Sequence, residues 1–156
     1  MQDLITASCV ANDVHAKSKK QLFNELATLL INGVPELANI APRDIVNPAL
    51  ERERLGSTGV GHGVALPHAR IEGISKVYAA FVRLKEPMDY EAIDERPVDL
   101  VAMIIAPEDA GGAHLRALAR LSRQLRRENS RARLRAAPDA QSIYIILSDD
   151  NTTAAA

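Results

Sequence analysis

The chain has 156 residues, 47% of them hydrophobic, with a net charge of −1 and an isoelectric point near 6.4. This length and apolar content suffice for one domain with a core, and the charge lacks the basic excess of proteins that hold nucleic acid, so no nucleic-acid partner is expected. The single Cys9 excludes an intrachain disulfide, and the lack of a signal peptide or an apolar run of about 18 residues predicts a cytoplasmic protein without membrane insertion.

The first firm structural signal is a helix that begins after Ser18. Residues 1–17 contain few apolar positions and leave helix and strand open. Ser18 and Gln21 have the spacing of a capping box, and apolar residues then recur at helical period up to Leu30. Gly33 and the proline that follows it are expected to end this amphipathic helix.

A second helical segment covers about residues 43–55. Pro48 leaves two alternatives, because it either begins the helix with Asn47 as its cap or kinks a longer helix. In both cases Arg52 and Glu53 lie in the last turns, next to a glycine-rich segment.

That segment spans residues 52–70 and reads RERLGSTGVGHGVALPHAR. Its four glycines predict a bend with free N–H groups that can approach a ligand or a neighbouring strand closely. The apolar run 64–66 is long enough for only a short strand, which Pro67 ends. His68 is therefore predicted to sit on a stiffened strand end.

Two strands and a helix are predicted after the glycine-rich segment. Residues 77–84 and 98–106 have strand character, and the second, VDLVAMIIA, is apolar almost throughout, which is typical of a central strand covered on both faces. A helix over residues 113–127 places leucines on one face (Leu115, Leu118, Leu121 and Leu125) and arginines on the other (Arg116, Arg120, Arg123 and Arg127). The arginine stripe favours a solvated face, with a docking surface for an acidic partner or nucleic acid as the alternative.

The remaining elements complete an α/β pattern. A short helix is expected near residues 131–136, and a last element, with strand propensity at residues 143–146, runs through residue 147. Helices interleaved with strands predict a mixed β-sheet flanked by helices on both faces. We expect a single domain over residues 1–148 and a disordered tail over residues 149–156.

Several side chains around the glycine-rich segment suit phosphoryl chemistry. A neutral imidazole at His68 can be nucleophilic at one nitrogen while a neighbour, often a backbone carbonyl, orients the hydrogen on the other. His114 lies in a predicted first helical turn, where free N–H groups attract phosphate and favour a neutral histidine. Arg52 can fork onto two phosphoryl oxygens unless it pairs with Glu51. Further candidate phosphoryl-binding donors are Ser57, Thr58, Gly59, Gly61 and Gly63.

A metal site is not predicted. The histidines 62, 68 and 114 have no carboxylate or cysteine at ligand spacing beside them, which disfavours zinc.

The pattern RE-x-x-GSTG-x-G-x-G-[VI]-A-[LI]-PH resembles the IIA domains of the fructose/mannitol type, EIIA type 2, of the bacterial phosphoenolpyruvate-dependent phosphotransferase system. The stretches AKSKKQLFNELATLL, AIDERPVDLVAMIIAP and HLRALARLSRQLRR extend this resemblance over nearly the whole chain. Within the family, the chain looks most like the nitrogen-regulatory IIA branch. His62 departs from the asparagine usual in the family, and Ala69 replaces a glycine often seen after the histidine.

The resemblance implies roles for individual residues. His68 matches the phosphorylated histidine, which carries the phosphoryl group on its tele nitrogen, and His114 matches a second histidine that binds and orients that group. Arg52 stands at the family's arginine position. The last element is implied to be a closing helix, and the activity is that of a phosphotransferase with a covalent phosphohistidine and no cofactor.

The function expected from this resemblance is regulatory. The chain would accept a phosphoryl group from an HPr-like phosphocarrier protein, and its phosphorylation state would alter binding to regulatory target proteins. The alternative is a sugar-transport IIA component that passes the group to a fructose/mannitol-type IIB domain. The lack of a fused IIB or membrane domain favours regulation, and the joint presence of His68, His114 and Arg52 disfavours a pure binding module.

Overall fold

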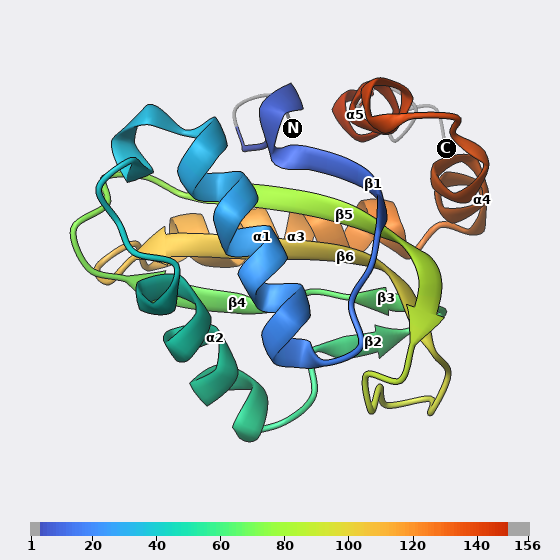
Figure 1. Cartoon of the computed structure of the whole chain (residues 1–156), viewed down its shortest axis with the longest axis horizontal. Helices are drawn as coiled ribbons and strands as arrows, with labels where there is room; N and C mark the ends of the chain where they lie inside the picture. The colour runs from blue at the N-terminus through green and yellow to red at the C-terminus, as the bar shows by residue number, and fades with distance from the viewer. Residues whose placement is uncertain (1–3, 150–156) are drawn as a thin grey trace.

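The computed structural model describes residues 4–149 and has a mixed sheet covered by helices on both faces (Figure 1). The strands are β1 (Val10–Val14), β2 (Gly59–Gly61), β3 (Val64–Ala65), β4 (His68–Ile71), β5 (Tyr78–Met88) and β6 (Val98–Pro107). The helices are α1 (Lys19–Gly33), α2 (Arg43–Arg54), α3 (Gly112–Leu125), α4 (Glu128–Ala136) and α5 (Ala140–Ser148), with 3-10 turns η1 (Ala7–Cys9) and η2 (Pro35–Leu37). The predicted α/β fold is confirmed.

Strand β6 organises the sheet. It pairs antiparallel with β5 on one side, and on the other side it pairs in parallel first with β3 and then with β4, so that Val64 lies opposite Leu100 and His68 opposite Ile104. Strand β1 extends the sheet beyond β5, and β2 extends it beyond β3. Strand β2 pairs with β3 and does not reach β4. Within residues 4–149, β4 therefore pairs with β6 alone.

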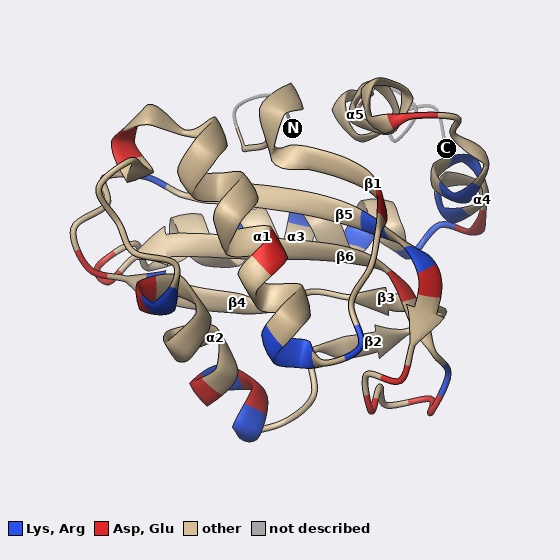
Figure 2. Cartoon of the chain, viewed as in Figure 1, with Lys and Arg blue, Asp and Glu red and all other residues tan. Residues whose placement is uncertain are grey.

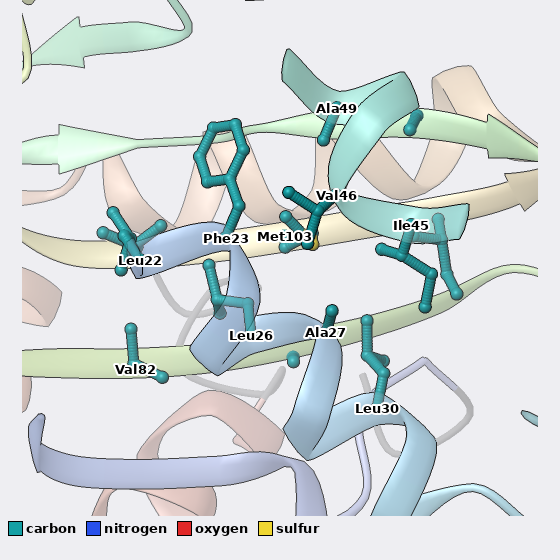
Figure 3. Packing of buried hydrophobic residues seen from close by; sticks show 14 of the residues in the cluster. Leu22, Phe23, Leu26, Ala27, Leu30, Ile45, Val46, Ala49, Val82 and Met103 are labelled. Carbon is teal, nitrogen blue, oxygen red and sulfur yellow. The ribbon is translucent and has the colours of Figure 1, made fainter. Parts of the chain in front are cut away.

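Helices α1 and α2 pack on the front face of the sheet in Figure 1 and α3 on the back. In the front layer, Leu22, Phe23 and Leu26 of α1 meet Val46 of α2 over Met103 of the sheet (Figure 3). All ten residues of β6 are buried except the half-buried Asp99, which confirms the prediction of a central strand with both faces covered. Cys9 is buried in the same layer.

The ends of α1 follow the predicted signals. The Ser18 Oγ accepts a hydrogen bond from the Gln21 backbone N–H at 3.1 Å, while the Gln21 Oε1 accepts from the Lys17 N–H at 2.9 Å. In a capping box this second bond would come from the N–H of the cap residue, Ser18. Here it comes from the N–H of Lys17, one residue earlier. The helix ends at Gly33, as predicted.

Helix α2 settles the alternatives left open at Pro48. The helix begins at Arg43 and includes the proline, so Asn47 is inside the helix and does not cap it. The first turn of α2 forms even though Pro48 has no N–H to donate to it. Burial of Ile45 and Val46 against α1 and the sheet stabilises this turn.

Several predictions are corrected by the fold. The glycine-rich bend is a β-hairpin of β2 and β3, and His68 begins a further strand, β4, that was not predicted. The α3 face toward the sheet consists of His114, Ala117, Leu121, Gln124 and Leu125, whereas Leu115 of the predicted leucine face is 66% exposed. The short helix begins earlier, at Glu128.

The C-terminal element is a helix, as the resemblance implied. Although residues 143–146 have strand propensity, α5 forms with Asp139 as its cap and buries Ile143 and Leu147. Of the tail predicted over residues 149–156, Asp149 is the C-cap of α5 and residues 150–156 lie outside the described part of the chain. None of the helices between residues 4 and 149 combines the length and apolar character needed to cross a membrane.

Candidate functional site

His68 is positioned by a break in the line of strand pairs along β6. Pro67 separates β3 from β4, and its carbonyl accepts the Ile104 N–H at 3.0 Å, so the chain stays in register with β6 across the break. In β4 the side chains alternate: Ala69 joins the α1–α2 core, whereas His68 lies across from α3, with its ring 5.3 Å from that of His114.

A cavity of about 490 Å³ opens beside β4, between α2 and α3, and we call it the histidine cavity. It brings together three of the predicted site residues, Arg52, His68 and His114. Its other lining residues are Pro48, Glu51, Leu55, Ala69, Arg70, Leu115 and Leu118.

The His68 imidazole is fixed by its own backbone. Its Nδ1 lies 3.0 Å from the carbonyl oxygen of Leu66. A carbonyl only accepts hydrogen bonds, so Nδ1 holds a proton, and in the neutral ring Nε2 is the nitrogen with the free lone pair. The ring is half-buried and meets the His114 ring edge to face, at an interplanar angle of 73°.

His114 is buried, with 7% of its surface exposed, and its Nε2 has no hydrogen-bond partner among the described residues. Burial lowers the pKa of His114 below its ordinary value of 6.5, and unfavourable electrostatic interactions of the protonated ring with His68 and Arg70 lower it further. His114 therefore stays neutral at neutral pH. An unpaired polar atom at this depth costs about 1–3 kcal/mol, which is typical of a site that awaits a ligand.

Two arginines border the histidine cavity. Arg52 donates from Nη1 to the Gly56 carbonyl at 2.9 Å, and the alternative pair with Glu51 is not formed because Glu51 pairs with Arg54. Arg70 was not predicted from the sequence as a site residue. It lies two residues after His68 on β4, so the alternation of a strand places it on the same face, but that signal required knowing that a strand begins at His68.

The other five predicted phosphoryl donors belong to the β2–β3 hairpin and its entry, and they are not among the described residues that line the histidine cavity. The Ser57 Oγ accepts the Gly59 N–H at 3.1 Å. The Thr58 side chain is buried, and its N–H and hydroxyl are bonded to Glu53. A Cβ at Gly59 would lie 2.7 Å from the Ala92 Cβ. Gly59 is thus explained by close packing within the fold.

The tip of the hairpin is held by two polar contacts. His62 has a left-handed φ of 59°, its N–H donates to the Asp94 carboxylate at 2.9 Å, and its carbonyl accepts from Arg135 at 2.7 Å. Gly61 lies beside Asp94, and Gly63, at a φ of 78°, leaves room for Arg135, whose Nη2 would clash with an added Cβ. Both glycines shape the turn.

A buried carboxylate ties the hairpin to the helices. Glu53 Oε2 accepts from the Thr58 hydroxyl at 2.5 Å, and Oε1 accepts from the Thr58 N–H at 3.0 Å and from Lys19 Nζ at 3.1 Å. Tyr90 completes the group through the Thr58 hydroxyl at 2.8 Å, with Lys19 Nζ 4.7 Å from its ring centroid. Burial raises the pKa of Tyr90, so its hydroxyl stays protonated. This cluster joins α1, α2, the hairpin and the β5–β6 connection.

Comparisons with known proteins agree with this geometry. Residues 3–150 match the family model described as "Phosphoenolpyruvate-dependent sugar phosphotransferase system, EIIA 2". The chain belongs to this EIIA type 2 family. Membership makes it a phosphotransfer protein of the phosphotransferase system, and the family named by the resemblance is confirmed.

The relatives favour the nitrogen-regulatory branch. A nitrogen regulatory protein of Bradyrhizobium diazoefficiens is 42% identical over 153 residues, covering 98% of this chain and 97% of the relative. One of Pseudomonas aeruginosa is 35% identical over 96% of this chain and 95% of the relative. The crystal structure of the nitrogen regulatory protein IIA-Ntr from Neisseria meningitidis superposes with a TM-score of 0.85 at 34% identity, over 94% of this chain and 97% of that one. These similarities support the regulatory interpretation over the sugar-transport alternative.

Within residues 4–149, no group of three or more histidine, cysteine, aspartate or glutamate side chains is arranged to hold a metal ion. The absence of a metal or organic cofactor stays an expectation.

We expect Glu53→Gln to destabilise the protein by about 2–4 kcal/mol, because it leaves the Lys19 ammonium without its carboxylate and weakens charged hydrogen bonds to Thr58. Urea unfolding measures this loss. Glu51→Gln, an exposed glutamate in the same helix, is the control and should change stability little. Equal stability losses in the two variants would contradict a special role for Glu53.

The lowered pKa of His114 predicts a loss of stability in acid. The unfolded chain binds a proton on this ring near pH 6.5, whereas the folded protein resists protonation to lower pH. Stability attributable to this group therefore falls as the pH drops below about 6.5, by at most about 1.4 kcal/mol per pH unit, until the folded-state pKa is passed. Urea midpoints measured from pH 7 to pH 5 should fall less steeply for His114→Gln. His15→Gln, at an exposed position, controls for the loss of one histidine, and an unchanged slope in His114→Gln would show that the ring titrates alike in both states.

Proposed function

We propose that this protein carries a phosphoryl group on His68 Nε2, received from an HPr-like phosphocarrier protein, and that the phosphorylation state of His68 regulates its partners. The observation that carries the proposal is the 3.0 Å contact between His68 Nδ1 and the Leu66 carbonyl. It leaves the lone pair on Nε2, the tele nitrogen, on a half-buried ring that lines the histidine cavity.

The proposed transfer needs no proton movement. The Nε2 lone pair forms a bond to phosphorus while the bond between phosphorus and the donor's nitrogen breaks, and that electron pair returns to the donor. His68 keeps its Nδ1 proton, whose hydrogen bond to the Leu66 carbonyl stabilises the positive charge that develops on the ring. Such a step depends on positioning and electrostatics, so the proposal includes no metal or organic cofactor.

The surroundings of His68 suit the charge that arrives. A phosphoryl group adds roughly two negative charges, and its oxygens require donors. Arg52 and Arg70 supply guanidinium groups at the border of the same cavity. His114, kept neutral by burial, can donate a hydrogen bond from Nε2 to a phosphoryl oxygen without a competing partner in the described chain. In this proposal, His114 and both arginines bind the phosphoryl group, whereas the five hairpin residues do not.

The regulatory part of the proposal rests on the relatives. Proteins named nitrogen regulatory protein match this chain over nearly its whole length. We therefore infer that its regulatory targets distinguish the phosphorylated form from the unmodified one. The proposal places this regulation in the cytoplasm. In the alternative function, the group would pass to a fructose/mannitol-type IIB domain.

Incubation with phosphoenolpyruvate and the two upstream carrier proteins should add one phosphoryl group, which intact-mass measurement detects. His68→Ala should abolish the labelling because the nucleophilic nitrogen is gone. His15→Ala removes an exposed histidine and should leave labelling intact. Normal labelling of His68→Ala would refute the assignment of His68.

The two branches predict different fates of the label. Regulation predicts a target that binds the unmodified protein and His68→Ala but binds the phosphorylated protein less tightly, by about 1–3 kcal/mol if the charges are close and partly desolvated. Pull-down with each form, repeated at higher salt, measures this difference. Fast transfer of the label to a IIB domain, with no target sensitive to the state of His68, would favour the transport alternative.

A further inference from the structure

A second cavity of about 240 Å³ lies between the β2–β3 hairpin and the last turns of α3, and we call it the hairpin cavity. The walls are mainly apolar on the hairpin side, where Val60, Val64 and Leu66 line it, while Ser122 and Arg126 line it from α3. This volume is below the roughly 300–1,000 Å³ of small-molecule pockets. It suits one or two side chains of a protein partner.

The hairpin cavity adjoins the histidine cavity. Leu118 lines one and Ser122 the other, which is a separation of about one helical turn on α3. On the sheet side, Leu66 and His68 are two residues apart along the chain. The two cavities therefore lie one after the other along α3, with His68 at one end and Arg126 at the other, and we call them together the groove.

Apolar side chains border this groove. Five large hydrophobic residues are exposed in the described chain, and three of them are at the groove: Leu55 at 84% and Leu115 at 66% line the histidine cavity, and Val60 at 45% lines the hairpin cavity. Since three of five such side chains gather here, a partner surface is a better explanation than scattered exposure.

The charge beside the groove is strongly basic, although the whole chain has a net charge of −1. Residues 116–135 contain eight arginines and one glutamate, and Figure 2 shows part of this charge on α4. Arg131 and Arg135 of α4 serve the fold by binding the carbonyls of residues 125 and 126 and the Asp99 carboxylate. Arg126, in contrast, is exposed at the hairpin cavity and forms no ion pair within residues 4–149.

The shape of the groove favours an extended occupant. The histidine cavity and the hairpin cavity are about one helical turn apart along α3, so an occupant that reaches both must be elongated. An extended peptide presents alternate side chains to the groove and to the solvent. At about 3.3 Å per residue, a few residues of such a peptide reach from Arg126 to His68.

We propose that the groove binds an extended, acidic segment of a regulatory target, with an apolar side chain in the hairpin cavity and a carboxylate near Arg126. The proposal rests on the proposed function, because phosphorylation of His68 places negative charge at one end of the groove. An acidic segment then meets repulsion and leaves. The charge and the apolar walls of the groove thereby indicate which side chains the regulated partner presents.

Two short fluorescein-labelled peptides test the proposal, one alternating leucine with glutamate and one alternating leucine with lysine. The full-length unmodified protein should bind the glutamate peptide in fluorescence anisotropy and the lysine peptide at least about tenfold more weakly. In amide NMR spectra, the glutamate peptide should shift the signals of residues 60–66 and 122–126. Phosphorylation of His68 should weaken its binding by about tenfold at low salt.

A matched charge reversal separates the groove from general attraction. Arg126→Glu should weaken the glutamate peptide by about tenfold, whereas Arg133→Glu, an exposed arginine of α4 that lines neither cavity, should have a much smaller effect. Equal binding of the two peptides, equal losses in the two variants or NMR shifts elsewhere would overturn the proposal.

The intact mass of each sample keeps this test apart from the proposed function. If the protein takes the phosphoryl group but binds the glutamate peptide equally well before and after, the groove proposal fails and the proposed function stands. If no phosphoryl group is added, the proposed function fails, and the control of this groove by His68 fails with it, whatever the unmodified protein binds.

Discussion

The buried carboxylate of Glu53 is the interaction on which the arrangement of the site depends. It binds Lys19 of α1 and Thr58 at the entry to the hairpin, so one charge holds together segments that are far apart in the sequence. Neighbouring residues on a helix point in different directions. With Glu53 turned into the protein, Arg52 faces the cavity that contains His68. The helix end is thus both an anchor for the hairpin and the source of a cation for the site.

Much of this fold could be predicted wherever the signal was local. The cap at Ser18 and the apolar run of β6 contain their own evidence of structure, and both were confirmed. Strand β4 was missed because its four residues, HARI, alternate polar and apolar types over too short a run to indicate a strand, and it forms through pairing with β6, more than thirty residues away. For α5, burial of Ile143 overrides a local preference for strand.

Within the site, the sequence indicated which residues take part, but it did not indicate what each of them contacts. His68 and His114 were predicted to be together from the resemblance, and the structure brings their rings into contact. The glycines looked like phosphate donors because a glycine-rich bend has free N–H groups, yet Gly59 and Gly63 are close to Ala92 and Arg135, which only the tertiary fold brings near. A glycine in a sequence shows that space or an unusual φ is required, without showing what occupies the space.

The left-handed turn at His62 limits which residues evolution can place there. Asparagine and glycine adopt a φ near 59° at little cost, histidine follows, and β-branched residues are excluded. Since the contacts to Asp94 and Arg135 are made by the backbone of His62, replacing the family's asparagine leaves both contacts in place. Among the residues that tolerate this φ, the side chain can therefore differ while the hairpin keeps its shape, so its chemistry can be adapted to different partners at little cost in folding.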